Sequence, residues 1–201
     1  DAGYVVASMY YRSSAEAHMP SQIIDVKTAI RFLRAHADQY EIDPERIGII
    51  GRSAGGHLSA LAAMNSDEFE SDEWCEFSSK VQACCDMFGP VDFVKLIEDD
   101  EQEMRTNPDF RWKTLEETHA GAVMGGDMAT IKERCKQFCP PYILTTDMSP
   151  MMILHGDCDK LVSCSISEDF YDKIVERGMD DRTEFYILNG AGHGTKEFFQ
   201  P

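Results

Sequence analysis

A serine between glycines stands where an apolar segment changes character. The stretch "GRSAGG" at 51–56 follows the apolar run "IGII" at 47–50 and precedes "HLSALAAM", which is compatible with a helix. Gly-X-Ser-X-Gly at a strand-to-helix turn holds the serine up as a nucleophile, and the glycines let strand and helix pass closely. Ser53 is therefore the candidate nucleophile, and the N–H of Ala54, near the predicted helix start, would face a developing oxyanion. The alternative is that Ser53 is a plain turn serine.

A serine hydroxyl is a weak nucleophile and needs a base, and a histidine base needs a carboxylate on its other ring nitrogen. His193, in the glycine-rich "NGAGHG", is the candidate base, and Asp159, in "HGDCDKLVS", is the candidate acid. Asp157 is an alternative acid, or it caps its own turn. We expect His57, one helical turn after Ser53, to line the floor of the site rather than to act as the base.

Two groups of residues have the right types for a metal site. His155, Asp157 and Asp159 alternate along an extended strand, which leaves little room for an ion between them. Cys135 and Cys139 are four residues apart, and no further ligand stands nearby at zinc-site spacing. We therefore predict no metal and no cofactor. Seven cysteines without a CxxC pair favour reduced thiols and a cytoplasmic location.

The pattern of apolar residues predicts an α/β protein with a mostly parallel central sheet and helices on both faces. In such sheets functional residues gather after the carboxyl ends of the strands, where Ser53, Asp159 and His193 all lie. A chain of 201 residues suits one domain. The predicted strands are 3–11, a short strand before Ser53, one within 81–93, 151–159 and 183–193; the predicted helices are 20–40, one following Ser53 and 165–179. The segment 3–11, nearly all apolar, is expected to be a central strand covered on both faces.

Two further segments do not fit the alternation of strands and helices. Residues 65–80 are charged and predict a surface loop, whereas residues 96–140 are irregular, polar and rich in methionine. The second segment suits a partly helical insertion better than a layer of the core.

The charge of the chain limits its partners. The formal net charge is -17 and the isoelectric point is about 4.6, so the surface repels nucleic acid and anionic membranes. No run approaches the roughly 18 apolar residues of a membrane span. A small-molecule substrate remains the expected partner, and the sequence leaves the oligomeric state open.

Several stretches together resemble the α/β-hydrolase superfamily, in its esterase/lipase branch near hormone-sensitive-lipase-like and bacterial feruloyl- or acetyl-esterase-like enzymes. They are "GYVVASMYYR", "DVKTAIRFLRAHADQYEIDPERIGIIGRSAGGHLSAL", "DMFGPVDF", "MMILHGDCDKLVS" and "NGAGHG", and they occur in family order. The resemblance implies Ser53 as nucleophile, Asp159 as acid, His193 as base and the Ala54 N–H as one oxyanion donor. It also implies that residues 96–140 form a cap over the pocket.

The chain departs from the family pattern in four ways. No "HGG" occurs, although such enzymes carry a His-Gly-Gly segment upstream that supplies further oxyanion N–H groups. Family members also usually continue with a helix after the histidine loop, whereas this chain stops at Pro201. We therefore expect residues 1–201 to be a single domain that is incomplete at both ends, and loss of one oxyanion donor typically lowers kcat by about 10²–10³. Arg52 stands where an acidic residue is frequent, and Ser163 where proline is common.

The leading hypothesis is a carboxylic ester hydrolase that forms an acyl-enzyme. Short-chain acyl esters or sugar-linked esters are the substrates that family analogy suggests. One alternative is a serine peptidase similar to prolyl oligopeptidase, which shares the Gly-X-Ser-X-Gly-Gly pattern and the order of the three residues. Another is a catalytically silent hydrolase fold used for binding, against which the intact set of three residues argues.

Overall fold

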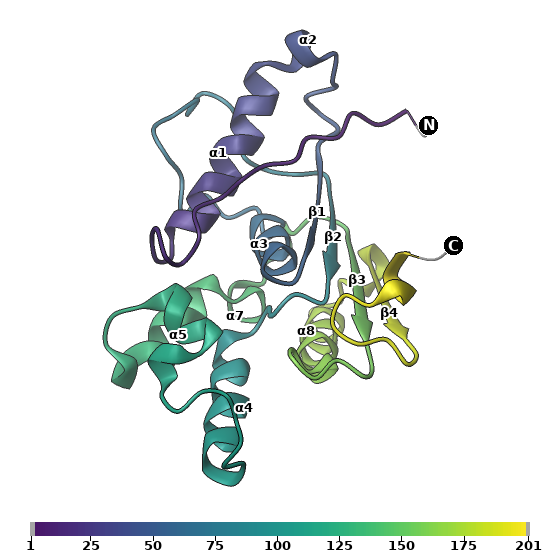
Figure 1. The fold of residues 1–201 in the computed structure, drawn as a ribbon. Helices are drawn as coiled ribbons and strands as arrows, with labels where there is room; N and C mark the ends of the chain where they lie inside the picture. Colours follow the sequence, from purple (N-terminus) through teal and green to yellow (C-terminus); the bar gives the residue numbers. More distant parts are fainter. Residues whose placement is uncertain (1–2, 200–201) are drawn as a thin grey trace.

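Four parallel strands form the sheet in the computed structural model, which describes residues 3–199. They lie side by side in chain order: β1 (Gly48–Arg52), β2 (Ala83–Met87), β3 (Met151–Gly156) and β4 (Thr183–Leu188). Because every strand runs in the same direction, all four carboxyl ends meet at one edge of the sheet (Figure 1). The loops that carry the candidate residues therefore come together there.

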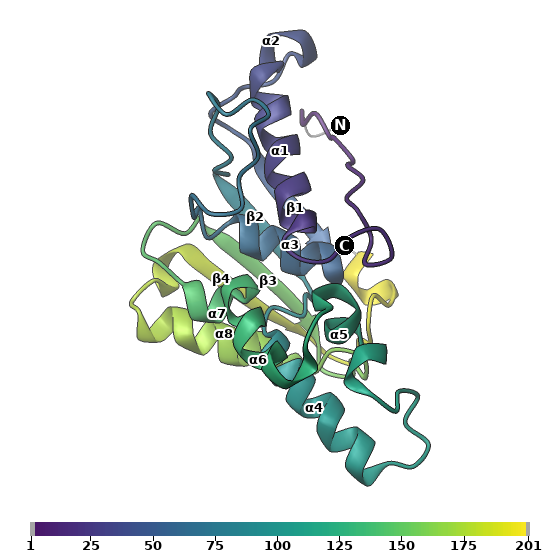
Figure 2. The ribbon, with the colours of Figure 1, turned by 90° about the vertical axis from the view of Figure 1, so that its left-hand side faces the viewer.

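The helices that pack on the sheet lie on one side of it. In α3 (Ala54–Ala62) the chain packs against β1 and β2, α1 (Ser21–Ala35) lies against α3, and α8 (Cys164–Glu176) covers β3 and β4 (Figures 1 and 2). Right-handed crossovers between strands that follow one another in order place every connecting helix on the same face. The other face of the sheet is exposed among residues 3–199, with Ile50 at 68%. The predicted α/β fold with a parallel sheet is confirmed. The helices that the sequence predicted for this second face are not found within residues 3–199.

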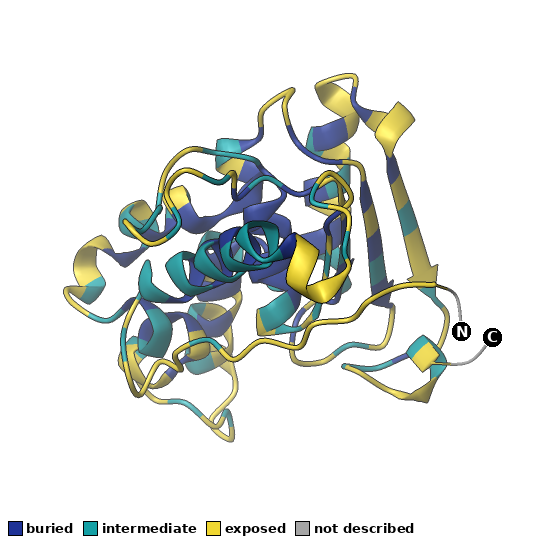
Figure 3. Cartoon of the chain, turned by 90° about the horizontal axis from the view of Figure 1, so that it is seen from above, coloured by how far each residue is buried: buried dark blue, intermediate teal, exposed yellow. Residues whose placement is uncertain are grey.

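The core lies between the helices and the sheet. Figure 3 shows buried residues concentrated there and exposed ones along the outer strand surface and the surrounding loops. Complete burial of one such large apolar side chain stabilises the fold by about 1.5–3 kcal/mol. The largest fully buried apolar side chains of the core include Ile23, Met64, Ile97, Ile153 and Phe170.

The prediction of a central strand at Gly3–Tyr11 is wrong. The segment forms no strand and runs along the outside of the molecule, with Tyr4 84% and Val6 86% exposed. A strand needs a hydrogen-bonded neighbour, and β1 has one neighbouring strand among the described residues, β2. Apolar composition signals a preference for burial, but it does not supply that neighbour.

The other predicted elements are present with shifted ends. The helix expected over 20–40 ends at Ala35, and a separate turn of helix, α2 (Ala37–Tyr40), follows it. Residues 65–80 contain neither helix nor strand, as expected for a loop. The last strand stops at Leu188, so that His193 stands in the loop after it.

A buried ionic cluster fixes the 65–80 loop to α1. The ammonium of Lys27 is almost fully buried and donates to the carbonyl oxygens of Ser66 and Glu68. Its charge is paired with Glu70 at 2.9 Å, and Arg31 pairs with the same carboxylate at 2.8 Å. Two cations and one carboxylate therefore hold a loop that has no secondary structure of its own.

The segment between β2 and β3 is largely helical. The first helix is capped by Asp92, whose carboxylate accepts from the N–H groups of Val94 and Lys95. None of the helices in residues 3–199 is long and apolar enough to cross a bilayer. The helices of this segment are α4 (Phe93–Thr106), η1 (Leu115–Glu117), α5 (His119–Met124), η2 (Met128–Thr130), α6 (Ile131–Cys135), η3 (Lys136–Phe138) and α7 (Pro140–Ile143); η4 (Asp180–Arg182) and η5 (Lys196–Phe199) lie further along the chain.

Candidate active site

Ser53 stands on a strained turn between β1 and α3. Its φ of 52° and ψ of -121° place a residue with a side chain in a region that only glycine visits readily. The neighbouring glycines explain how the turn closes, because a Cβ on Gly51 would lie 2.1 Å from the Gly55 carbonyl oxygen and one on Gly56 would lie 2.3 Å from Asp86 Oδ1. The Ser53 N–H donates to the Met87 carbonyl at 2.9 Å, which ties the turn to the end of β2.

The structure brings the three predicted side chains into one hydrogen-bonded row. Ser53 Oγ lies 2.8 Å from His193 Nε2, and His193 Nδ1 lies 2.7 Å from Asp159 Oδ2. These residues are far apart in the chain and come from the loops after β1, β3 and β4. A carboxylate can only accept, so Nδ1 carries the hydrogen and Nε2 is left to accept from the serine hydroxyl.

The carboxylate of Asp159 is buried and fully engaged. Its Oδ1 accepts from the N–H groups of Leu161 at 2.8 Å and Val162 at 3.0 Å. Burial alone would raise the pKa of Asp159, but the contacts with His155, His193 and these two N–H groups outweigh burial and lower the pKa below its usual range. Asp159 therefore stays ionised beside His193.

The alternative acid, Asp157, has a different hydrogen-bond partner. Its side chain is exposed, and Oδ1 accepts from the Gly190 N–H at 2.7 Å. Asp157 thus ties the loop after β3 to the loop after β4, as a turn-capping residue would. The oxygen that faces His193 belongs to Asp159.

His57 is buried against the helical segment rather than lining an open floor. Its Nε2 donates to the Phe138 carbonyl at 2.6 Å, and its ring packs on Phe93 with the centroids 4.4 Å apart. Burial, only partly opposed by the bond to Phe138, lowers the pKa of His57 to about 4. A neutral ring with one nitrogen committed in this way joins α3 to the segment that follows β2.

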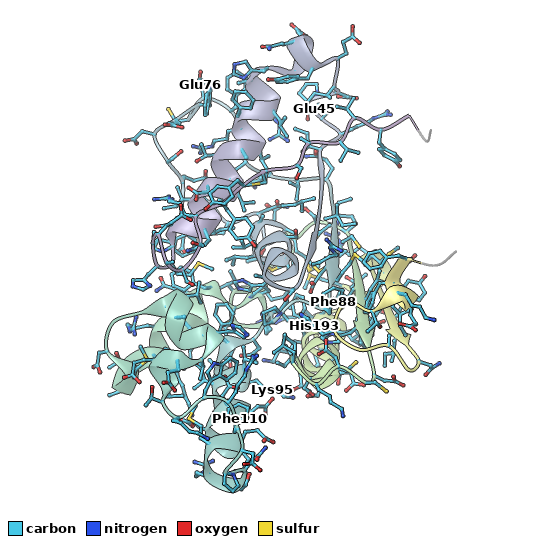
Figure 4. The ribbon with its side chains drawn as sticks, in the orientation of Figure 1. Glu45, Glu76, Phe88, Lys95, Phe110 and His193 are labelled. Carbon is cyan, nitrogen blue, oxygen red and sulfur yellow. The ribbon has the colours of Figure 1, made fainter. Side chains whose placement is uncertain are left out.

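Sequence reasoning missed Phe88. This buried residue follows β2 with a φ of 47°, and its ring meets the His193 ring edge-on with the centroids 4.7 Å apart (Figure 4). Phe198 also packs on Phe88, with its ring centroid 4.6 Å from that of Phe88. The aromatic contact limits the rotation of His193. The motif "MFGP" at the end of a predicted strand is the one feature of the sequence that could have indicated Phe88.

Neither group considered for metal binding forms a set of three ligands within the described residues: of the candidate ligands, His155 lies near Asp159 alone, and Cys139 contacts only Cys135. His155 Nε2 is bonded to the Val162 carbonyl at 2.9 Å, while Asp157 faces Gly190. No cluster of three histidine, cysteine or carboxylate side chains suited to a metal ion is found within residues 3–199. All seven cysteines are free thiols.

The backbone N–H of Ala54 is available at the start of α3. Ala54 is the first residue of the helix, so its N–H has no helical acceptor one turn earlier. It is exposed and directly follows Ser53, at the positive end of the helix dipole. This position suits an N–H that receives negative charge next to the serine.

A second buried carboxyl group lies beneath the turn. Asp86 is completely buried; Oδ1 accepts from the Gly89 N–H at 3.0 Å, and Oδ2 has no partner within the described residues. Burial raises the pKa of Asp86 to about 7, and His155 and the Gly89 N–H oppose the rise. A group that holds its proton more tightly when folded makes stability fall as the pH rises.

We expect Asp86→Asn to remove this pH dependence. Below about pH 4 the wild-type carboxyl is protonated in both states, and above the folded pKa its penalty reaches at most about 4 kcal/mol. The stability of the variant relative to wild type should therefore rise as the pH increases from about 4 to about 8. Urea unfolding at these two pH values measures the difference in the free energy of unfolding. Glu76→Gln, which changes the charge equally at an exposed position far from the site (Figure 4), is the control. A constant difference across the pH range would contradict the prediction.

The parallel sheet, the strained serine turn and the three side chains at its carboxyl edge define an α/β-hydrolase of the esterase/lipase type. A family model described as BD-FAE matches residues 1–174, and the chain belongs to that family.

Known relatives agree with this assignment. The probable carboxylic ester hydrolase LipM of Mycobacterium tuberculosis is 30% identical over 174 residues, which are 86% of this chain and 38% of that protein. A truncated form of a carbohydrate esterase from gut microbiota has a TM-score of 0.73 at 29% identity, with 96% of this chain and 68% of that chain covered. A bifunctional GH43-CE protein of Bacteroides eggerthii has a TM-score of 0.79 at 30% identity, with 95% and 25% covered. The chain spans less than half the length of LipM.

Proposed function

We propose that the protein is a carboxylic ester hydrolase that works through an acyl-enzyme on Ser53. The observation that carries the proposal is the row of two short hydrogen bonds from Ser53 Oγ through His193 to Asp159. Nucleophile, base and orienting carboxylate each lie within the reach that covalent catalysis by serine requires.

The geometry suggests the order of steps. His193 Nε2 takes the proton of Ser53 as its oxygen attacks the ester carbonyl, and the Ala54 N–H faces the oxyanion that develops. The imidazolium, stabilised by Asp159, then returns the proton to the leaving alcohol. Water activated by the same nitrogen attacks the acyl-enzyme and releases the acid.

The helical segment between β2 and β3 is proposed as the cap of this single domain, over residues 96–140. His119 on α5 supports the proposal: burial, the charge of Arg111 and the charge of His193 lower the pKa of His119, so α5 reaches the neighbourhood of the site. Arg111 donates to His119 Nε2 at 3.0 Å and stacks on Trp112 at 3.8 Å. Arg111, Trp112 and His119 therefore form a cluster of one cation and aromatic rings within the segment proposed as the cap.

Short-chain acyl esters and acyl groups on sugars are the proposed substrates. The similarity to a carbohydrate esterase and to a GH43-CE protein supports this class, and neither likeness fixes the acyl group or the alcohol. A cytoplasmic location stays a prediction from the cysteine content.

Active-site labelling tests the proposal. The purified chain is treated with a fluorophosphonate and the added mass is mapped; we expect label on Ser53 and a loss of labelling in His193→Ala. Absence of label on the folded chain would count against the proposal. An ester panel beside an aminoacyl-nitroanilide then separates an esterase from a peptidase.

A further inference from the structure

A second histidine lies directly behind the acid. His155, on β3, is completely buried and uses both ring nitrogens. Nδ1 lies 2.7 Å from the hydroxyl of Ser167, itself completely buried on α8, and Nε2 lies 2.9 Å from the Val162 carbonyl oxygen. Because a carbonyl oxygen only accepts, Nε2 carries a hydrogen.

The same Nε2 faces the acid. It lies 3.4 Å from Asp159 Oδ2, which is the oxygen that accepts from His193 Nδ1 at 2.7 Å. The other oxygen, Oδ1, is taken by the N–H groups of Leu161 and Val162. The carboxylate thus has a donor behind it and His193 in front of it, and neither oxygen is free to turn.

Val162 connects the whole loop after β3 to His155. Val162 donates its N–H to Asp159 and accepts from His155 with its carbonyl oxygen, so the loop after β3 closes on the ring. Ser167 in turn fixes the plane of that ring from α8. An unbroken row of hydrogen bonds and close contacts runs from α8 through His155 and Asp159 to His193 and Ser53.

We propose that His155 is a positioning residue for Asp159: its Nε2–H, oriented by Ser167, holds the loop after β3 and the carboxylate in the direction that His193 requires. The inference rests on the proposed function, because it assigns a task to a residue that supports the same site. The ionisable groups that face His155 are Asp159 from the loop and Asp86 from β2. From the sequence alone, this histidine is considered only as a metal ligand, which the spacing disfavours, and its contact with Asp159 depends on the tertiary structure.

The expected size of the effect follows from geometry. A displacement of about 1 Å in a catalytic group lowers the rate by about 10²-fold, and loss of the residues that orient metal-bound histidines and carboxylates, a comparable task, typically costs about 10–100-fold. Removal of the Nε2–H takes away the donor behind Oδ2 and the bond to the Val162 carbonyl, and leaves Oδ1 with the N–H groups of Leu161 and Val162. The rate of the chemical step should therefore fall, while contacts with the substrate stay in place.

The test compares His155→Leu, which removes the donor, with His155→Gln, which retains an N–H donor. We expect His155→Leu to slow fluorophosphonate labelling of Ser53 by about 10–100-fold and to lower kcat on an ester with little change in KM. His155→Gln should recover part of the rate. His36→Leu, in a histidine bonded to its own helix at Phe32, is the control and should behave as wild type.

A second readout does not depend on turnover. The proton between His193 Nδ1 and Asp159 Oδ2 should give a far-downfield proton resonance, which we expect to shift or broaden in His155→Leu and to stay in place in His36→Leu. Ser167→Ala, which leaves the histidine but releases its ring, should show the same change to a smaller extent. If His155→Leu fails to fold, as judged by thermal unfolding, Ser167→Ala and His155→Gln decide the question.

The outcomes separate this inference from the proposed function. Wild-type rates and an unchanged resonance in the folded His155 and Ser167 variants would overturn the positioning role and leave the esterase proposal intact. An unlabelled wild-type chain would overturn the esterase proposal, and the resonance would still report whether His155 orients Asp159.

Discussion

Replacing Asp159 by asparagine should lower kcat on an ester by about 10⁴-fold, whereas the same change at Asp157 should leave kcat within about twofold. An asparagine can turn its NH₂ group toward His193 Nδ1, which then accepts and leaves the hydrogen on Nε2. That tautomer cannot take the proton of Ser53. The loop keeps its shape, because the remaining amide oxygen still accepts from Leu161 and Val162.

The pair of aspartates provides the control within one loop. Asp157→Asn removes the same charge two residues away and retains an oxygen for the Gly190 N–H. Steady-state kinetics on a chromogenic ester, with fluorophosphonate labelling as a check of the serine, measures both variants. Equal losses in the two variants would show that net charge, and not the bond to His193, controls the rate.

Replacing Glu70 by glutamine should destabilise the protein by about 3 kcal/mol, because two buried cations lose their counter-charge. Removal of one partner from a buried ion pair costs about 3–5 kcal/mol, and the lower end applies since the Glu70 side chain is 20% exposed. Lys27 retains its two carbonyl acceptors, which limit the loss. Urea unfolding at neutral pH measures the change in the free energy of unfolding.

Glu68→Gln is the matched control for this cluster. Glu68 lies in the same loop, its side chain is exposed, and its carbonyl oxygen makes the contact with Lys27. The control should change stability by less than about 0.5 kcal/mol. The loss in Glu70→Gln should also persist at high salt, because buried pairs are weakly screened. If the loss of stability in Glu70→Gln disappeared at high salt, the prediction would be wrong, because the ion pairs would then be screened by solvent.

The turn around Ser53 could be predicted because its causes are local. An apolar strand, glycines at 51, 55 and 56 and a helix-compatible segment lie next to one another in the chain. The absence of side chains at Gly51 and Gly56 is what lets the strand and helix approach, and it is visible in the sequence. The strands of the described sheet were likewise found from short apolar runs, although their ends shifted by several residues.

The choice between the two aspartates required the tertiary structure. Asp157 and Asp159 lie two residues apart in one loop, and either could meet a histidine from another loop. The register of β3 with β4 decides it: Gly156 lies opposite Leu188, so Gly190 comes against Asp157 and the longer reach to His193 falls to Asp159. No local pattern contains that register.

The sequence by itself determined the serine turn, the order of the three candidate residues and an α/β fold, since each depends on neighbours in the chain or on periodicity. The tertiary structure decided which contacts join distant segments: Phe88 against His193, His155 behind Asp159, and the ionic cluster that holds the 65–80 loop. It also decided against the strand at Gly3–Tyr11. The physical reason is the same in each case, because burial and hydrogen bonding of a segment depend on partners that the segment does not contain.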